Sequence, residues 1–332
     1  MKSYLVDVPV RINIWIRPDC QKEQFEVIKK ARPSILFIQS DGGRTEEEWK
    51  AIYQNRKLFD EGIDWECTVY RFYENENLGL YKMGHKVLDF IWKIVDRCIL
   101  LEDDQIPTVS FFRFCAELLE RYKDDERIEC ICGVNQLESW RDADSDYFFS
   151  RQGSIWGVAT WKRVAININN RDYLNSDYVK HLLKQRTSKN KTIWKRIVGY
   201  SKSTYYEGHV ASLEFLFELD MYSQNRLQII PKKNMISYIG ANNRSEHADE
   251  LKMLPRGIRR VFNMKIYEIE FPLNNPEYVI PDIKYEKYRN RVMGYNFPWI
   301  VFVRKMERLF LMIRYGKIDE VIEKFRNKEI EK

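Results

Sequence analysis

The first 135 residues alternate between short apolar segments and longer amphipathic ones, and this alternation constrains the fold more than any other feature. The strand-like segments are 8–16, 34–39, 67–73, 98–101 and 128–134, separated by helix-like segments at 20–32, 45–61, 78–97 and 108–125. Repeated strand–helix units build a mostly parallel sheet with helices on both faces. The sequence therefore predicts an α/β fold, in which ligands bind at the carboxyl ends of the strands.

The remaining residues are less regular. Segment 180–203 is strongly basic and is predicted to be a mobile insertion, whereas 208–224 has helical character and 226–231 is typical of a strand. The last segment, 297–332, is amphipathic and predicts a C-terminal helical extension.

Composition excludes several classes of protein. The chain has 332 residues and is 44% hydrophobic, enough for a sizeable core. Its net charge of +6 is too small for a dedicated nucleic-acid binder, so we expect no nucleic-acid partner. The N-terminus lacks the apolar core of a signal peptide, and no run of about 18 apolar residues occurs. We therefore predict a cytoplasmic protein, with a peripheral position at the inner membrane face as an alternative.

Three adjacent acidic residues, Glu102, Asp103 and Asp104, directly follow the apolar run Cys98–Leu101. Adjacent carboxylates repel one another, and a divalent cation such as Mg²⁺ or Mn²⁺ removes that repulsion. Such a cation needs only one or two protein carboxylates when substrate phosphates complete its coordination, so the pattern favours a diphosphate substrate. The alternative is a loop of solvated carboxylates.

Six segments follow one another along the chain in a recognisable order. One is "ILLEDDQIPTVSFF" (99–112), in which the acidic triplet is followed by a Pro and a Phe-rich helix. The other segments are "IWIRPDC" (14–20), "FIQSDGG" (37–43), "NLGLYKMGHKVLDF" (77–90), "SIWGVATWKR" (154–163) and "IGANNRSEH" (239–247). Together they resemble the N-acetylglucosaminyltransferase I family of nucleotide-sugar glycosyltransferases and its bacterial relatives, which have the GT-A fold and a Glu-Asp-Asp form of the metal motif. "SLEFLF" (212–217) lies where the family places a catalytic carboxylate.

The resemblance implies a metal-dependent transfer of sugar from a UDP-sugar, with inversion, to a saccharide or lipid-linked saccharide. It divides the chain into a nucleotide-sugar-binding half (1–165), an acceptor-binding half (166–285) that contains the basic insertion, and a helical extension (286–332). Departures from the family pattern are the position of His85, displaced by about one residue, and Glu rather than Asp at 214.

On the donor side, the resemblance implies that Asp104 coordinates the metal, Asp103 binds the ribose, and Glu102 supports one of them. Arg17 is expected to add a positive charge near the diphosphate. A surface Arg is the alternative for Arg17.

Three further donor-side residues follow from the resemblance. Asp41 is expected to recognise the uracil, although a simple Asp-Gly turn is the alternative. His85 is expected to contact the base, and His247 is expected to bind the metal or the diphosphate. Structural or exposed histidines are the alternatives for the last two.

On the acceptor side, Glu214 is the predicted general base, with Glu218 and Asp220 as competing candidates. Trp156 and Trp161 are predicted to stack on an acceptor sugar, with core packing as an equal alternative. The basic insertion is predicted either to close over the diphosphate or to be a solvated loop.

The C-terminal segment 297–315 groups apolar side chains on one side and basic side chains elsewhere. This pattern fits an anionic membrane interface, and docking onto the catalytic domain or a homodimer partner is the alternative. Two other functions remain open: a non-catalytic nucleotide-sugar-binding module and a sugar nucleotidyltransferase. The second usually has a Gly-rich loop after the first strand, and "RPDCQKEQ" lacks it.

Overall fold

The structure is a computed structural model of the whole chain. It describes residues 1–169, 176–187, 191–203, 205–206, 209–210, 213–239 and 252–317.

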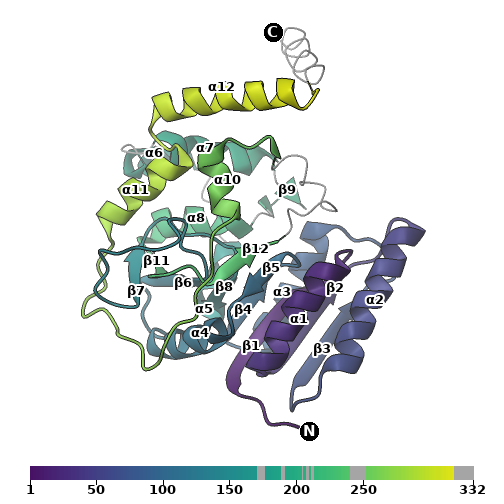
Figure 1. Cartoon of the computed structure of the whole chain (residues 1–332). Helices are drawn as coiled ribbons and strands as arrows, with labels where there is room; N and C mark the ends of the chain where they lie inside the picture. Colours follow the sequence, from purple (N-terminus) through teal and green to yellow (C-terminus); the bar gives the residue numbers. More distant parts are fainter. Residues whose placement is uncertain are drawn as a thin grey trace.

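A twisted eight-stranded sheet forms the centre of the molecule (Figure 1). Four neighbouring pairs of strands are parallel and three are antiparallel. The strands lie in the order β3 (Thr68–Tyr73), β2 (Pro33–Ser40), β1 (Val6–Asn13), β4 (Arg97–Leu101), β8 (Val158–Trp161), β6 (Ile128–Cys132), β11 (Leu227–Pro231) and β7 (Tyr147–Ser150). The predicted α/β class, with a mostly parallel, Rossmann-like sheet, is confirmed.

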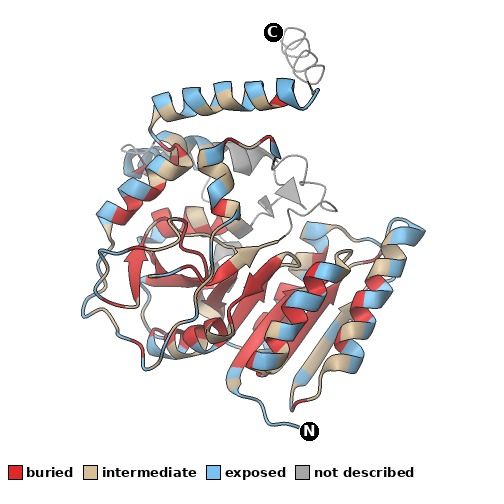
Figure 2. Ribbon diagram, in the orientation of Figure 1, coloured by how far each residue is buried: buried red, intermediate tan, exposed pale blue. Residues whose placement is uncertain are grey.

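The centre of the sheet is apolar on both faces because helices cover both. Figure 2 shows its strands almost entirely buried. In β1 and β4 the buried side chains include Val10, Ile12, Ile99 and Leu101. A strand buried on both faces appears as a continuous apolar run, which is why "CILL" is a strand despite its short length.

Four helices connect the strands of the first half. These are α1 (Pro18–Ala31), α2 (Glu46–Gly62), α3 (Leu80–Ile94) and α4 (Val109–Arg121). Figure 1 shows α1 and α2 side by side in front of the sheet and α3 behind it. Phe25 of α1 packs on Phe59 of α2 with ring centroids 4.8 Å apart, whereas Phe90 of α3 packs on Phe72 of β3 at 5.2 Å.

The second half adds helices around the far end of the sheet. They are α5 (Lys162–Asn169), α6 (Asp177–Arg186), α7 (Lys191–Ser203), α8 (Leu213–Gln224), α10 (Arg256–Phe262), α11 (Ile283–Met293) and α12 (Pro298–Arg314). Two short antiparallel pairs complete the fold: β5 (Gln105–Pro107) with β12 (Ile236–Tyr238), and β9 (Tyr205–Tyr206) with β10 (His209–Val210).

The basic segment 180–203 differs from the predicted insertion. It forms most of α6 and all of α7, and it is anchored by the buried side chains of Leu183, Ile193 and Ile197. Charge dominates its composition, but apolar residues at helical spacing supply a face that packs on the protein.

The predicted boundary at residue 165 does not interrupt the sheet. Strand β11 comes from the second half and lies between β6 and β7 of the first half. The two predicted halves therefore share one sheet, and their assignment to donor and acceptor remains a prediction.

Candidate active site

The acidic triplet lies where the two central strands end. In the parallel pair β1–β4, Ile12 is in register with Leu101, so Asn13 and Glu102 continue side by side beyond the paired residues. Helix α1 starts five residues after β1, at Pro18, and brings its first turns beside the same strand ends. The strand order therefore places residues almost 90 positions apart in the sequence at one edge of the sheet.

Glu102 is held by side chains of β1. Arg11, whose side chain is 3% exposed, donates from Nη1 to Glu102 Oε1 at 3.1 Å and to the Leu101 carbonyl at 3.2 Å. Asn13 Nδ2 donates to Glu102 Oε2 at 3.2 Å. Both carboxylate oxygens of Glu102 thus have donors within the protein, which fits a supporting role better than a ligand role.

Asp103 and Asp104 face the guanidinium of Arg17. Arg17 Nη1 donates to Asp104 Oδ2 at 2.7 Å, and its Nε lies 3.7 Å from Asp103 Oδ2. Burial raises the pKa of Asp103 to about 7, with Arg17 opposing the shift and Asp104 and Glu102 adding to it. Burial also raises the pKa of Asp104, against the opposing effect of Arg17. The single positive charge of Arg17 does not fully offset the free-energy cost of burying these carboxylates beside one another.

The main chain of the triplet is fixed from α1. Gln24 Nε2 donates to the carbonyls of Glu102 and Gln105, at 2.8 and 2.7 Å, and Gln21 Nε2 donates to the Asp103 carbonyl at 2.9 Å. Gln21 and Gln24 are fully buried and one helical turn apart, so they lie on the same face of α1. They satisfy the carbonyl groups of the loop and leave the carboxylates of Asp103 and Asp104 available to a ligand.

Tyr238 connects the acidic site to its neighbour. The hydroxyl of this β12 residue lies beside the carboxylate of Asp104, which adds to the burial that raises the pKa of Tyr238. Its ring stacks on Trp156 with centroids 5.0 Å apart, and Trp156 also packs on Phe262 at 5.1 Å. An aromatic row therefore runs from the acidic site to α10.

A cavity of about 180 Å³ lies at the other end of this row. The cavity is lined by carboxylates, guanidinium groups and aromatic rings. Its lining residues include Trp156, Arg196, Glu214, Glu218, Phe262 and Arg289. Charged groups combined with flat rings are suited to a polar ring such as a sugar.

Two glutamates of α8 compete for Arg196 in that cavity. Arg196 Nη2 donates to Glu214 Oε1 at 2.8 Å, and its Nε lies 3.4 Å from Glu218 Oε2. The side chain of Glu214 is 45% exposed, whereas that of Glu218 is 14% exposed. Burial raises the pKa of Glu218, and Arg196 and Arg289 oppose that shift. Glu218 Oε2 itself is buried, and its contact with Arg196 Nε is an ion pair that lacks the geometry of a hydrogen bond.

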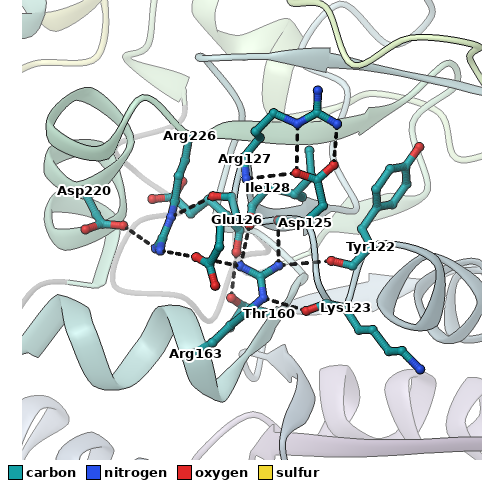
Figure 3. A network of polar contacts seen from close by, with 11 residues as sticks. Tyr122, Lys123, Asp125, Glu126, Arg127, Ile128, Thr160, Arg163, Asp220 and Arg226 are labelled. Atoms are coloured by element: carbon teal, nitrogen blue, oxygen red, sulfur yellow. Dashed lines mark hydrogen bonds and ion pairs between the residues drawn. The ribbon is translucent and has the colours of Figure 1, made fainter.

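The third candidate base, Asp220, belongs to a buried ion pair (Figure 3). Arg226 Nη1 donates to Asp220 Oδ2 at 2.8 Å, with the two side chains 5% and 1% exposed. Arg226 Nη2 also donates to Glu126. This environment gives Asp220 a role in holding α8 to the start of β11.

Asp41 is bound to the main chain ahead of α3. Its Oδ1 accepts from the amides of Gly42 and Leu78, at 2.9 and 2.8 Å, and its Oδ2 accepts from the Gly79 amide at 2.9 Å. Gly42 is required here because a Cβ would lie 2.3 Å from the Glu76 carbonyl carbon. His85 lies on the second turn of the helix that follows and is half-buried. Base recognition by Asp41 and His85 remains a prediction.

The two predicted stacking tryptophans have different environments. Trp156 lines the cavity, whereas Trp161 is 3% exposed and donates from Nε1 to the Leu119 carbonyl at 2.9 Å. Core packing, the alternative for both, is what the structure shows for Trp161, because its position in β8 directs the ring onto α4. His247 lies outside the described residues.

Within the described residues, no three His, Cys, Asp or Glu side chains are grouped to hold a metal ion. Asp103 and Asp104 nevertheless fit a hard divalent cation. They are paired carboxylates whose pKa values are raised mainly by burial, and such a cation needs only one or two of them beside substrate phosphates.

Several residues of the site have no signal in the sequence. Tyr238 resembles an ordinary strand residue, and Arg196 and Arg289 are two of 55 basic side chains. A detectable signal was the spacing of Gln21 and Gln24 on the apolar face of α1, where a polar residue requires a buried partner.

Comparisons with known proteins find similarity to solved structures but not to curated sequences or families. No protein-family model and no curated protein matches the sequence. Among solved structures, the chain is similar to a mannosyltransferase from Pyrobaculum calidifontis in complex with GDP-Man and Mn²⁺. The two are 10% identical with a TM-score of 0.38, over 98% of this chain and 82% of that chain. The function of this protein must therefore be argued from its own residues.

Proposed function

We propose that this protein is a metal-dependent glycosyltransferase. It moves a sugar from a UDP-sugar, with inversion, to a saccharide or lipid-linked saccharide in cell-surface polysaccharide or glycan synthesis. The observation that carries the proposal is the pair Asp103 and Asp104 at the carboxyl end of a central strand, joined through Tyr238 and Trp156 to a cavity with a buried carboxylate.

On the donor side, Asp104 holds the divalent cation and Asp103 accepts a hydrogen bond from the ribose. The cation supplies positive charge that offsets the charge developing on the leaving diphosphate. Arg17, already 2.7 Å from Asp104, adds a second positive charge beside the same phosphates. Glu102, Gln21 and Gln24 keep the loop in position.

On the acceptor side, a carboxylate accepts the proton of the attacking hydroxyl. We place this role on α8, where burial favours Glu218 over the originally predicted Glu214, because a raised pKa makes a carboxylate a better base near neutral pH. Arg196 contacts both glutamates, and its positive charge limits the rise in the pKa of Glu218. Trp156 offers its ring to the acceptor sugar.

Two alternatives remain. A binding module with the same fold would bind a nucleotide sugar but would not transfer it. A sugar nucleotidyltransferase would need phosphate-binding glycines after β1, whereas Arg17 and Pro18 lead directly into α1.

The proposal is tested by thermal unfolding with UDP-glucose, UDP-N-acetylglucosamine and GDP-mannose, each with and without Mn²⁺. We expect a rise in Tm that needs the metal and disappears in Asp104→Ala. Asp124→Ala, an exposed acidic residue outside the site, should behave as the wild type. A shift without metal contradicts the metal site, and binding of UDP without release of UDP from any donor supports the binding module.

A further inference from the structure

Helix α12 is attached to the protein along one side only. Arg304 Nη2 donates to the Val292 carbonyl of α11 at 2.6 Å, and Glu307 Oε1 accepts from the Arg256 amide of α10 at 3.0 Å. Met312 is buried on the same side. These contacts fix the rotation of the helix, which lies along the edge of the molecule in Figure 1.

The opposite side of α12 is apolar and exposed. It carries six large side chains that are 45–73% exposed, which we call the α12 stripe: Trp299, Phe302, Val303, Met306, Phe310 and Ile313. At about 100° per residue, these positions fall within an arc of about 100°. Figure 2 shows the outer surface of this helix exposed along its length. A continuous exposed apolar stripe on a helix is an interaction surface rather than scattered surface residues.

Basic side chains border the stripe on both sides. At about 100° per residue, Lys305 lies beyond one edge and Arg314 beyond the other, whereas Arg304 and Arg308 fall on the docked side. Residues 298–317 contain Arg304, Lys305, Arg308, Arg314 and Lys317 against Glu307 alone, which is five positive charges minus one negative, or +4. The exposed Lys191 and Lys195 of α7 lie close to the start of α12, because Thr192 Oγ1 accepts from the Asn296 amide at 3.2 Å.

The positive charge around the α12 stripe distinguishes between two possible partners, a second copy of the chain and a lipid membrane. A second copy of the chain would bring the same patch against itself, because a two-fold contact is isologous, and would oppose +4 with +4. An anionic lipid surface is complementary to that charge and also accepts the apolar side chains. Trp299 and Phe302, whose rings stack at 5.6 Å, are residue types suited to the boundary between headgroups and acyl chains.

We propose that α12 lies in the interface of an anionic membrane, with the α12 stripe inserted between headgroups and the surrounding Lys and Arg side chains on anionic lipid. No helix among the described residues is long and apolar enough to cross a bilayer, so this contact is peripheral. Membrane binding in this form needs neither metal nor nucleotide sugar, and its test is independent of the proposed transferase activity.

The test is co-flotation of the full chain with vesicles of phosphatidylcholine alone or with roughly 30% phosphatidylglycerol. We expect binding to the anionic vesicles only, weakened by about 0.5 M NaCl. Trp299→Glu/Phe310→Glu should lose binding by at least about tenfold. Lys305→Gln and Arg314→Gln should each weaken it about fivefold, the equivalent of about 1 kcal/mol per charge.

Leu5→Glu/Tyr53→Glu is the matched control, since these residues are 60% and 61% exposed at the N-terminal end of the molecule. It should bind vesicles as the wild type does. Equal binding by wild type and Trp299→Glu/Phe310→Glu would overturn the proposal. So would a lipid-free dimer that this double variant converts to a monomer, without any wild-type binding to vesicles, because the stripe would then be a self-association surface.

Discussion

Arg17 Nη1 donates to Asp104 Oδ2 over 2.7 Å, so the protein itself places a positive charge, the Arg17 guanidinium, on the acidic pair. The guanidinium occupies the side of Asp104 that is also closest to Asp103, with 3.7 Å between Arg17 Nε and Asp103 Oδ2. A metal held by Asp104 would therefore share that carboxylate with Arg17, and the phosphates of a donor would lie close to both positive charges.

This relationship predicts opposite effects of one substitution. Arg17→Gln should bind Mn²⁺ alone more tightly, by about tenfold, because the competing positive charge is gone, a change of about 1.4 kcal/mol. It should bind UDP with Mn²⁺ more weakly, because the diphosphate loses a partner. Isothermal titration of Mn²⁺, and of UDP at saturating Mn²⁺, measures both. Arg44→Gln, an exposed Arg paired with Glu48, should change neither. Weaker binding of Mn²⁺ alone would contradict the shared site.

The second prediction concerns the two glutamates of α8. Glu218→Gln should lower kcat by about 10²–10⁴-fold, the usual contribution of a general base, while UDP binding is retained. Glu214→Gln should lower it less than about tenfold, because that side chain is 45% exposed, against 14% for Glu218. Steady-state transfer assays with Tm recorded for each variant make the comparison. The reverse order of the two effects would return the role to Glu214.

The third prediction is a pH dependence of stability from Glu129. This carboxyl is fully buried in β6, where burial raises its pKa well above the ordinary value, with Asp220 adding to the rise and Gln228 opposing it. The folded state therefore binds a proton that the unfolded state releases above about pH 4.3, so stability falls as pH rises until the folded group ionises. The slope is at most about 1.4 kcal/mol per pH unit.

Glu129→Gln removes this dependence. Relative to wild type, its free energy of unfolding should increase between pH 5 and pH 8 in urea titrations. Glu47→Gln, on the exposed side of α2, is the control and should leave the pH profile unchanged. A constant difference between wild type and Glu129→Gln at all pH values would show that Glu129 is ionised in the folded protein.

The fourth prediction concerns the ion pair in Figure 3. Arg226→Leu should lower the free energy of unfolding by about 3–5 kcal/mol, because Asp220 is left buried and unpaired. Arg226→Leu/Asp220→Leu should be less destabilising than Arg226→Leu alone, since no buried charge remains. Arg127→Leu removes an exposed pair with Asp125 in the same region and should cost less than about 1 kcal/mol. Additive effects of Arg226→Leu and Asp220→Leu in chemical denaturation would contradict the coupling.

Local sequence determined the elements that its own residues stabilise. Thr45 is the N-cap of α2, where its side chain accepts from the Glu48 amide at 3.2 Å, an arrangement for which the Thr-x-x-Glu pattern is typical. The apolar run before Glu102 is a strand of the expected length. The short strands β5, β7, β8 and β12 were not predicted, because three or four residues carry too little periodicity and their pairing partners are distant in the chain.

Sequence alone placed the acidic triplet at the end of a buried strand, since an apolar run and its following residues are adjacent in the chain. Only the tertiary structure decided what faces that triplet. The order of strands in the sheet brings Arg11 and Arg17 to it, and the pairing of β5 with β12 brings Tyr238. Likewise, Glu214, Glu218 and Asp220 are alike in sequence, and burial separates them, because the free energy of a carboxylate depends on the solvent and charges around it.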